Sequence, residues 1–372
     1  MKNNYTFSAI RIAHKYPLLS NIIKQAVFWI LSYSLLLLII HYNTASIINA
    51  VDVEFHNPVI SMGVVVILAG LILGFSLGLI DAVLAKNQFK NMPLGISILI
   101  GGVLYFIVLM LVINFIRFFL LNYASQLVFD EISIRILEDN WKYYNYILMA
   151  YSFFMTLVIS FVNQMNKRFG PGILIPLLFG RYRYPREEER IFMFMDLTSS
   201  TKLAERLGHL KYSALIQDSF LDINRMVKKY NAEIYQYVGD EIVVSWPLHI
   251  PGRFSCIDFF FAVQEQLQSR KEYYLQRYGI TPHFKAGVHA GIVTAVEVGD
   301  VKRDIAYHGD TLNVAARIEG LCKIYNESIL ISGTVNSMEN IRNSYLSNSL
   351  GYQELQGREN PVEIFSIEKR RI

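Results

Sequence analysis

The fold of the second half of this chain is decided by the stretch Ile191-Phe-Met-Phe-Met195-Asp196. Five consecutive apolar residues that end at a single aspartate predict a short strand buried on both faces. Two further strands are predicted downstream, at Glu233–Val238 and Ile242–Trp246. The Gly239-Asp240 pair between them is typical of a tight hairpin.

The rest of this half alternates between helical and strand patterns. Helices are predicted at Thr201–Asn231 (with a break near Gly208), Cys256–Tyr278 and Gly309–Tyr325. Strands are predicted at Phe284–His289, Gly291–Val298, Ser328–Ile331, Gly351–Leu355 and Val362–Ile367. Because a strand, a helix, two strands, a helix and a strand follow one another, residues 189–372 are predicted to form a ferredoxin-like α+β domain.

Four long stretches in the first half contain no Asp, Glu, Lys or Arg, namely Gln25–Val51, Asn57–Ile80, Asn91–Ile116 and Tyr143–Asn166. Each has between 24 and 27 residues, and about 20 apolar residues are enough to cross a bilayer. The composition agrees, since 53% of all residues are hydrophobic and only 18% are charged. We therefore expect an α-helical four-span membrane domain at residues 1–166, in contact with the lipid bilayer.

Charges in the loops predict the orientation of these spans. The first loop carries only Asp52 and Glu54. Basic residues precede the first span, lie in the second loop and follow the fourth span: Lys2, Arg11, Lys15, Lys24, Lys86, Lys90, Lys167 and Arg168. Because positively charged flanks stay in the cytoplasm, both termini are expected there. The chain is thus expected to be an integral protein of the plasma (inner) membrane with a cytoplasmic α+β domain.

A juxtamembrane linker is predicted at residues 167–188. Its prolines, Pro171, Pro176 and Pro185, prevent the sustained heptads of a coiled coil. Only two cysteines occur in the chain, which excludes a disulfide scaffold. The net charge of +4 belongs to the apolar half, and acidic and basic residues balance from residue 171 onward. No nucleic-acid partner is therefore expected.

Two aspartates lie at the ends of predicted strands, Asp196 and Asp240. Neighbouring strands can place both carboxylates at one edge of the sheet, where they repel one another unless a cation lies between them. Mg²⁺ or Mn²⁺ suits such oxygen ligands, and Mg²⁺ usually binds through one or two carboxylates plus substrate phosphates. The pattern favours a nucleoside triphosphate site, with turn-forming aspartates as the alternative. Glu241 is expected to point away from Asp240.

Three motifs resemble those of the class III nucleotidyl cyclases. They are Phe194-Met-Asp196-Leu-Thr-Ser-Ser-Thr201-Lys-Leu-Ala-Glu-Arg-Leu, Tyr235-Gln-Tyr-Val-Gly239-Asp240-Glu-Ile and His308-Gly-Asp-Thr-Leu-Asn313-Val-Ala-Ala-Arg317-Ile-Glu. The three motifs occur in the family's order, and the resemblance extends from about Glu189 to Ile367, or half of the chain. It implies an enzyme in which the 3′-hydroxyl of a purine nucleoside triphosphate attacks the α-phosphate, releasing a cyclic nucleotide and pyrophosphate.

The resemblance also implies roles for individual residues. Asp196 and Asp240 match the metal-binding aspartates, with the backbone carbonyl of Leu197 as a further ligand, for two Mg²⁺ or Mn²⁺ ions per site. Asn313 matches the asparagine that orients the ribose, and Arg317 matches the arginine that neutralises charge on the reacting phosphate. In the family these two groups come from different subunits, so a homodimer with two composite sites is expected.

Substrate phosphates are expected at two places. The turn Leu197, Thr198, Ser199, Ser200 and Thr201 matches the loop whose amides contact the triphosphate, as a helix N-terminus can. Ser199-Ser200 replaces the Gly-Phe that is common in the family. Arg358 stands where relatives carry a phosphate-binding lysine, and a guanidinium can hold phosphate through two hydrogen bonds.

The two positions that read the purine depart from the family. Gln236 aligns with the base-reading lysine of adenylate cyclases, and Ala306 aligns with its aspartate or threonine partner. A glutamine amide both donates and accepts, so it suits either adenine or guanine, and Tyr307 or His308 could contribute. We expect an adenylate cyclase in signal transduction, because adenylate cyclases dominate the bacterial relatives. A guanylate cyclase and a catalytically silent, nucleotide-binding dimerisation domain are the alternatives.

Overall fold

The structure is a computed structural model. It describes residues 17–51, 59–84, 94–119, 131–169, 179–248, 256–301, 303–338, 345–356, 358 and 360–370. The chain divides into two compact units, Met1–Leu174 and Ile175–Ile372.

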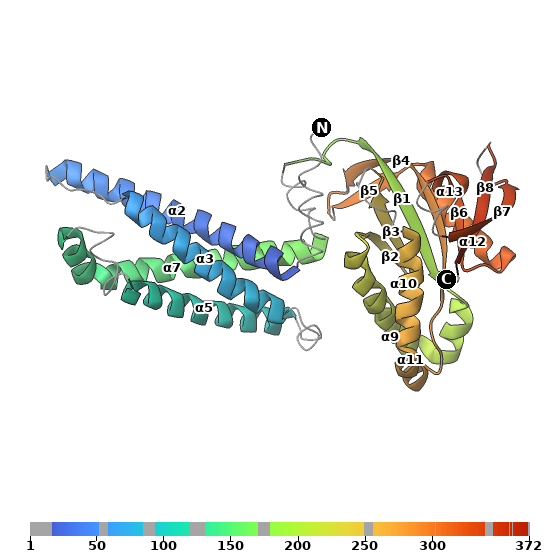
Figure 1. The fold of residues 1–372 in the computed structure, drawn as a ribbon, viewed down its shortest axis with the longest axis horizontal. Coiled ribbons are helices and arrows are strands. Elements are labelled where there is room, and N and C mark those ends of the chain that lie inside the picture. Colours follow the sequence, from blue (N-terminus) through green and yellow to red (C-terminus); the bar gives the residue numbers. More distant parts are fainter. Residues whose placement is uncertain are drawn as a thin grey trace. The chain divides into compact units, whose positions relative to one another are not determined.

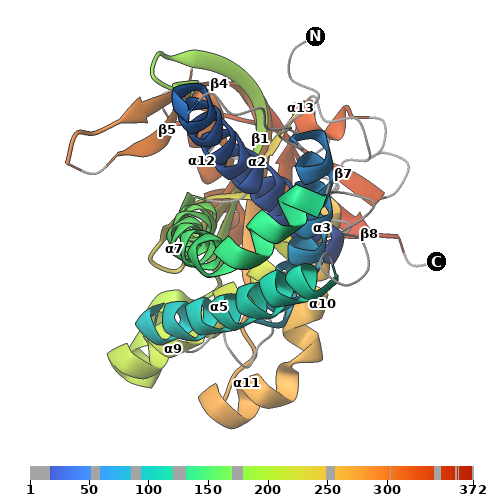
Figure 2. The same cartoon turned by 90° about the vertical axis from the view of Figure 1, so that its left-hand side faces the viewer.

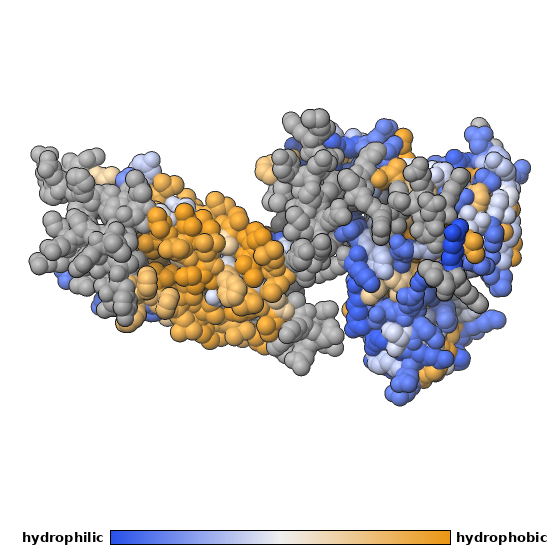
Figure 3. Space-filling model, viewed as in Figure 1, coloured by the Kyte–Doolittle hydropathy of each residue, from blue (hydrophilic) through white to orange (hydrophobic). Residues whose placement is uncertain are grey.

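The described part of the first unit consists of four long helices (Figure 1). They are α2 (Pro17–Val51), α3 (Val59–Leu84), α5 (Leu94–Phe119) and α7 (Glu131–Phe169). Among the described residues, all four are long and apolar enough to cross a membrane, which confirms the four predicted apolar helices. The face of these helices seen in Figure 3 is covered mainly by hydrophobic side chains, as contact with lipid tails requires.

A stripe of glycines on α3 brings this helix close to α2. A Cβ added at Gly74 would lie only 2.4 Å from the Cβ of Ala26, and additions at Gly70 and Gly78 would meet α2 in the same way. Small residues four apart permit the close backbone approach on which helices rely where no hydrophobic driving force acts between them. The sequence Gly70-xxx-Gly74-xxx-Gly78 is therefore the packing surface of α3.

A polar cluster lies inside the helical unit. The Gln25 amide nitrogen donates to Oδ2 of Asp81 at 2.8 Å and to the Tyr105 hydroxyl oxygen at 2.9 Å. Tyr105 also donates to the second carboxylate oxygen of Asp81, and Nε1 of Trp29 donates to the side-chain Oε1 of Gln25 at 3.2 Å. Asp81 directly follows the second predicted charge-free stretch, and these donors satisfy its carboxylate between α2, α3 and α5.

The second unit is built on one mixed sheet. Its described strands are β1 (Arg186–Leu197), β2 (Glu233–Val238), β3 (Glu241–Pro247), β4 (Phe284–Val298), β5 (Asp304–His308), β6 (Ile329–Ser332), β7 (Tyr345–Gln353) and β8 (Val362–Lys369). They follow the order β2-β3-β1-β4-β6-β8-β7, with β5 paired to β4 alone. The pair β4–β6 is parallel and its strands are joined through α12, whereas the other pairs are antiparallel.

Helices cover both faces of this sheet (Figures 1 and 2). They are α9 (Ser200–Lys229), α10 (Cys256–Ser269), α11 (Lys271–Tyr278), α12 (Asp310–Tyr325) and the single turn α13 (Gly333–Asn336). Met193 and Met195 of β1 share a buried cluster with residues of α9, α10 and α11. Phe192, on the opposite face of β1, packs in another cluster with Ala315 of α12. The predicted strand is therefore buried on both faces, and the α+β fold class is confirmed.

The structure refines several predicted boundaries. Helix α9 contains the predicted break, since Gly208 has φ 71° and ψ 165°. The helix predicted at Cys256–Tyr278 is two helices that meet at Arg270, and β4 is one strand that runs through Gly291. The short strand β5 was not predicted, because its five residues include Asp304 and His308 and show little apolar pattern. Strand β1 begins at residue 186, within the predicted linker.

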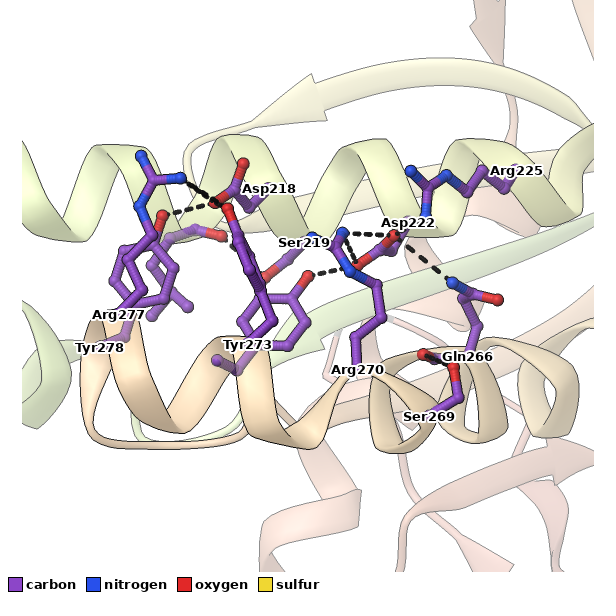
Figure 4. A network of polar contacts seen from close by, with 12 residues as sticks. Asp218, Ser219, Asp222, Arg225, Gln266, Ser269, Arg270, Tyr273, Arg277 and Tyr278 are labelled. Atoms are coloured by element: carbon purple, nitrogen blue, oxygen red, sulfur yellow. Dashed lines mark hydrogen bonds and ion pairs between the residues drawn. The ribbon is translucent and has the colours of Figure 1, made fainter. Parts of the chain in front are cut away.

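Helices α9, α10 and α11 are held together by a network around two aspartates (Figure 4). Asp222 is fully buried, and its carboxylate accepts bonds from Arg270 at 2.7 and 2.9 Å. Arg225 donates to the same carboxylate at 2.8 Å and Tyr274 at 2.6 Å. One turn earlier, Asp218 accepts hydrogen bonds from the Tyr273 and Tyr278 hydroxyls, both at 2.6 Å. Ion pairs and tyrosine hydrogen bonds to these two aspartates thus hold α9 against α10 and α11.

Candidate active site

Asp196 and Asp240 lie next to each other at one edge of the sheet. Asp196 is the penultimate residue of β1, and Asp240 lies in the tight turn between β2 and β3, where Gly239 has φ 63°. Their side chains interact directly, and together with burial the negative charge of Asp240 raises the pKa of Asp196. Oδ2 of Asp240 is buried and has no hydrogen-bond partner. This is an electrostatically unfavourable arrangement that a cation would relieve.

Three charged residues that the sequence analysis did not assign to the site surround this pair. Nζ of Lys285, on β4, lies 3.5 Å from Oδ2 of Asp196 and 3.0 Å from Oε1 of Glu319 on α12. In the β ladder Asp196 stands opposite Lys285 on one side and Glu241 on the other, so all three share a face. Lys285 therefore supplies one positive charge to a cluster of four carboxylates.

Glu241 does not point away from the site as expected. Burial, followed by the negative charges of Glu319, Asp196 and Asp240, raises its pKa to about 7. The expectation failed because Asp240 belongs to the turn and not to the strand, so the alternation of side chains does not relate the two residues. A lone lysine in the apolar strand Phe284–Val298 was the sequence signal for Lys285, and Glu319 ends the third motif, where it was given no role.

The turn after β1 is tightly held. The Thr198 amide donates to the His283 carbonyl at 2.9 Å, and Ser199 has the left-handed φ of 60°. Glycine adopts this conformation more easily than serine, so Ser199 holds a backbone geometry that is unusual for its side chain. Helix α9 begins at Ser200, and no side chain caps its N-terminus. The amides of this first helical turn are available to an anion.

Tyr212 of α9 was also missed from the sequence. Its hydroxyl contacts Ser200 and Asp240, and burial together with the charge of Asp240 raises its pKa to about 12. The phenol therefore stays protonated and acts as a donor beside the aspartate pair. It lies eleven positions beyond Thr201 in the chain, which is too far for the local pattern to have indicated it.

Asn313 and Arg317 lie on α12, which packs tightly on β4. A Cβ at Gly287 would lie 2.1 Å from the Glu319 amide nitrogen, and one at Gly291 would lie 2.6 Å from Oγ1 of Thr311. Asn313 is exposed, while Nη1 of Arg317 is buried and lacks a hydrogen-bond partner. Within the described residues, no hydrogen bond or ion pair joins this pair to the two aspartates of the same chain.

Arg358 lies beside Asp310, the first residue of α12. Its Nε is 3.3 Å from Oδ2 of Asp310, and its charge helps burial to lower the pKa of His289 to about 4. His289 bonds through Nδ1 to the Ser332 hydroxyl at 2.7 Å. Arg358 thus neighbours α12 and not the aspartate pair.

Gln236 and Ala306 occupy β2 and β5 respectively. Gln236 is exposed and pairs with Val243, which puts it on the same face as Asp196. Ala306 is half-buried and pairs with Val296. No contact between the two side chains appears among the described residues. The ring of Tyr307 lies against Arg190, with the guanidinium carbon 4.9 Å from the ring centre.

The chemistry of the donor set fits a divalent cation bound together with substrate. In the described ranges no group of three or more His, Cys, Asp or Glu side chains is arranged to hold a metal ion. Two adjacent carboxylates, one with a buried and unpaired oxygen, nevertheless match the usual mode of Mg²⁺, which takes its remaining ligands from phosphates and water.

Comparison with known sequences identifies the family. The profile of the adenylate and guanylate cyclase catalytic domain matches residues 183–369, which is half of the chain. This chain belongs to that family. Enzymes of the cyclase family generally use divalent metal ions, in agreement with the paired aspartates.

Named relatives of this cyclase domain are adenylate cyclases. Adenylate cyclase 2 of Rhizobium meliloti (strain 1021) is 34% identical over 223 residues, covering 59% of this chain and 61% of the relative. Adenylate cyclase 1 of the same organism is 28% identical, and the match covers 48% of this chain and 27% of the relative. Adenylate cyclase of Anabaena cylindrica is 25% identical, and the match covers 47% of this chain and 36% of the relative. The chain thus spans less than two thirds of the length of each relative.

Solved structures of cyclases resemble half of the chain. Adenylyl cyclase CyaB from P. aeruginosa has a TM-score of 0.45 at 21% identity, covering 50% of this chain and 97% of that one. The guanylate cyclase domain of RhGC from Catenaria anguillulae, solved with GTP, has a TM-score of 0.43 at 20% identity, covering 50% and 100%. Because these TM-scores are low, the family is assigned from the sequence match at residues 183–369.

Proposed function

We propose that the chain is a membrane-bound adenylate cyclase, which converts ATP to 3′,5′-cyclic AMP and pyrophosphate and acts in signal transduction. The observation that carries this proposal is the contact between Asp196 and Asp240, with a buried and unpaired oxygen on Asp240. Two carboxylates kept side by side cost stability unless a ligand compensates, and such a cost is typical of functional sites.

Asp196, Asp240 and the backbone carbonyl of Leu197 are the residues that would hold Mg²⁺ or Mn²⁺, two ions per site. When bound, these ions acidify the attacking hydroxyl and neutralise phosphate charge. Helix α9 offers its uncapped N-terminal amides, at Ser200 and Thr201 of the turn after β1, to the triphosphate. Tyr212 keeps its proton and donates beside Asp240, which orients that carboxylate.

Asn313 and Arg317 are proposed to act on the site of a second copy. Arg317 has a buried, unpaired Nη1, and Asn313 is exposed on the same helical face, four residues earlier. A guanidinium in a site of preorganised donors stabilises the charge that develops on the transferred phosphate. Because the pair makes no bond to the aspartates of its own chain, a homodimer with two composite sites accounts for both sets of residues.

ATP is favoured as the substrate by the three named relatives, which are all adenylate cyclases. Gln236 itself can bond to either purine, so GTP is the competing substrate. Arg358 is proposed to bind phosphate after leaving Asp310, since a 3.3 Å ion pair at the surface is weak enough to exchange.

The apolar helices are proposed to span the plasma (inner) membrane, with the cyclase domain in the cytoplasm. Basic residues at both flanks of the helical unit support this orientation. The side chains exposed on the helices are mainly large and apolar, which supports contact with lipid.

The decisive experiment is turnover of ATP and of GTP by the purified full chain with Mn²⁺, read as pyrophosphate release. Asp240→Asn keeps the shape of the side chain but removes the charge, and we expect turnover to be lost. The matched control is Asp300→Asn, which changes an exposed aspartate in the turn after β4 and should leave turnover unchanged. Absence of turnover with both nucleotides in the unmodified chain would favour the silent nucleotide-binding domain.

A further inference from the structure

Strand β2 contains one extra residue between two successive backbone pairs with β3. Ile234 pairs with Val244. The following pair joins Gln236 to Val243, so Tyr235 is the extra, bulged residue. A β-bulge re-aims the side chain of the extra residue and occurs often beside active sites and on edge strands. Here β2 is an edge strand of the sheet.

The bulge directs Tyr235 to strand β5. The Tyr235 hydroxyl oxygen accepts a hydrogen bond from the backbone N–H of Tyr307 at 3.2 Å. The two rings are in edge contact, with centroids 5.1 Å apart. In the sheet, β2 pairs with β3 and β5 pairs with β4, so no ladder joins the two strands. Tyr235 therefore ties together two strands that backbone pairing leaves separate.

A buried arginine, Arg190, also contacts the Tyr307 ring. Arg190 is only 3% exposed, and its guanidinium carbon lies 4.9 Å from the centre of the Tyr307 ring. It is paired with Glu233 and with Glu188, the latter at 3.1 Å, and it donates to the Ser245 hydroxyl at 2.9 Å. Burial alone would lower the pKa of Arg190, but Glu233 and its other neighbours raise it, so the charge is fixed.

The tied residues adjoin the two positions expected to read the purine. Gln236 directly follows Tyr235, and Ala306 directly precedes Tyr307. Gln236 is exposed on an edge strand, where its backbone pairs with Val243 of β3 on one side. Fixing a binding group in advance lowers the entropy lost when a ligand binds. A hydrogen bond one residue away from each reading position restrains both of them.

We propose that Tyr235 is a positioning residue for purine recognition: by holding β2 to β5 it sets the distance between Gln236 and Ala306. This inference rests on the proposed function, because it assumes that a purine nucleotide binds there. It goes further in assigning purine affinity to a tyrosine that need not touch the nucleotide.

The test compares Tyr235→Phe with Tyr237→Phe in the full chain. Both tyrosines lie on β2 and flank Gln236, but the Tyr237 hydroxyl donates to Asn224 of α9 at 2.9 Å and makes no bond to β5. Steady-state kinetics with Mn²⁺ and either ATP or GTP gives KM and kcat. Titration calorimetry of the same two nucleotides gives Kd without any need for turnover.

We expect Tyr235→Phe to weaken purine binding by about three- to tenfold, as loss of one hydrogen bond allows. KM and Kd should rise, the preference between ATP and GTP should change, and kcat should stay within about twofold. Tyr237→Phe should leave all of these values unchanged. Equal KM and Kd in the two variants, or a fall in kcat alone, would overturn the proposal. Failure of the proposed function is recognised separately, since the unmodified chain would then show no turnover while Kd still reports on Tyr235.

Discussion

The buried carboxylate of Asp222 gives the sharpest stability prediction. It is fully buried and accepts two bonds from Arg270, one from Arg225 and one from Tyr274. Asp222→Asn keeps the shape but places an amide N–H₂ against donors, and it leaves Arg270 without its counter-charge. Removing one partner of a buried ion pair typically costs about 3–5 kcal/mol. We expect that loss in the free energy of unfolding of the α+β unit.

Pulse proteolysis of the full chain in urea measures this loss, because the sizes of the surviving fragments identify the unit that has unfolded. With a urea dependence of about 2 kcal/mol per molar, the midpoint should fall by roughly 2 M. The control is Arg225→Gln, which removes a partner whose side chain is 39% exposed and should cost about 1 kcal/mol or less. Equal shifts in the two variants would refute the reasoning, because burial would then not govern the cost.

Three other outcomes are expected. Mixing Asp240→Ala chains with Arg317→Ala chains should restore about a quarter of the unmodified turnover, because half of the dimers are mixed and each mixed dimer has one intact site of two. An inactive mixture would contradict sites shared between subunits. The pKa of His289 is lowered to about 4 from 6.5, so the folded domain binds fewer protons between these values. Its free energy of unfolding should therefore fall by up to roughly 3 kcal/mol as the pH drops from 6.5 to 4. Urea unfolding followed by circular dichroism should show a smaller fall in this free energy for His289→Gln than for the unmodified chain. An equal fall in the two proteins would contradict the role of His289. Gly74→Val should lower the thermal stability of the helical unit in detergent, because its Cβ would overlap α2, whereas Gly63→Val has nothing within 4 Å and should not.

Much of the α+β unit could be predicted because its signals are local. An apolar run that ends at Asp196 and a Gly-Asp turn at Asp240 each specify a strand end. Antiparallel pairing of β1 with β3 then brings the two aspartates to the same edge. The kink at Gly208 and the hairpin turn at Gly239 were likewise visible, because glycine marks a positive φ.

The missing parts of the site depend on contacts between distant segments. Lys285 and Glu319 approach Asp196 only when β4 and α12 pack on β1, which no local pattern reports. The same is true of Tyr212, which comes back to Asp240 from α9. Asp81 falls just beyond a charge-free stretch, so only the assembled helices identify its donors. These residues come together only through tertiary packing, so the sequence alone did not identify them.

The extra residue in β2 has a consequence for aligning this chain with its relatives. Side chains of a strand alternate with a period of two, so an insertion of one residue exchanges the faces of everything on its far side. Counting back from Gly239 in steps of two therefore assigns side chains to the correct face of the sheet as far as Gln236. From Ile234 toward the N-terminus the same count assigns them to the wrong face. A relative that lacks the extra residue would present different side chains to the aromatic rings of Phe192 and Tyr307, which Tyr235 contacts here, even at high sequence identity.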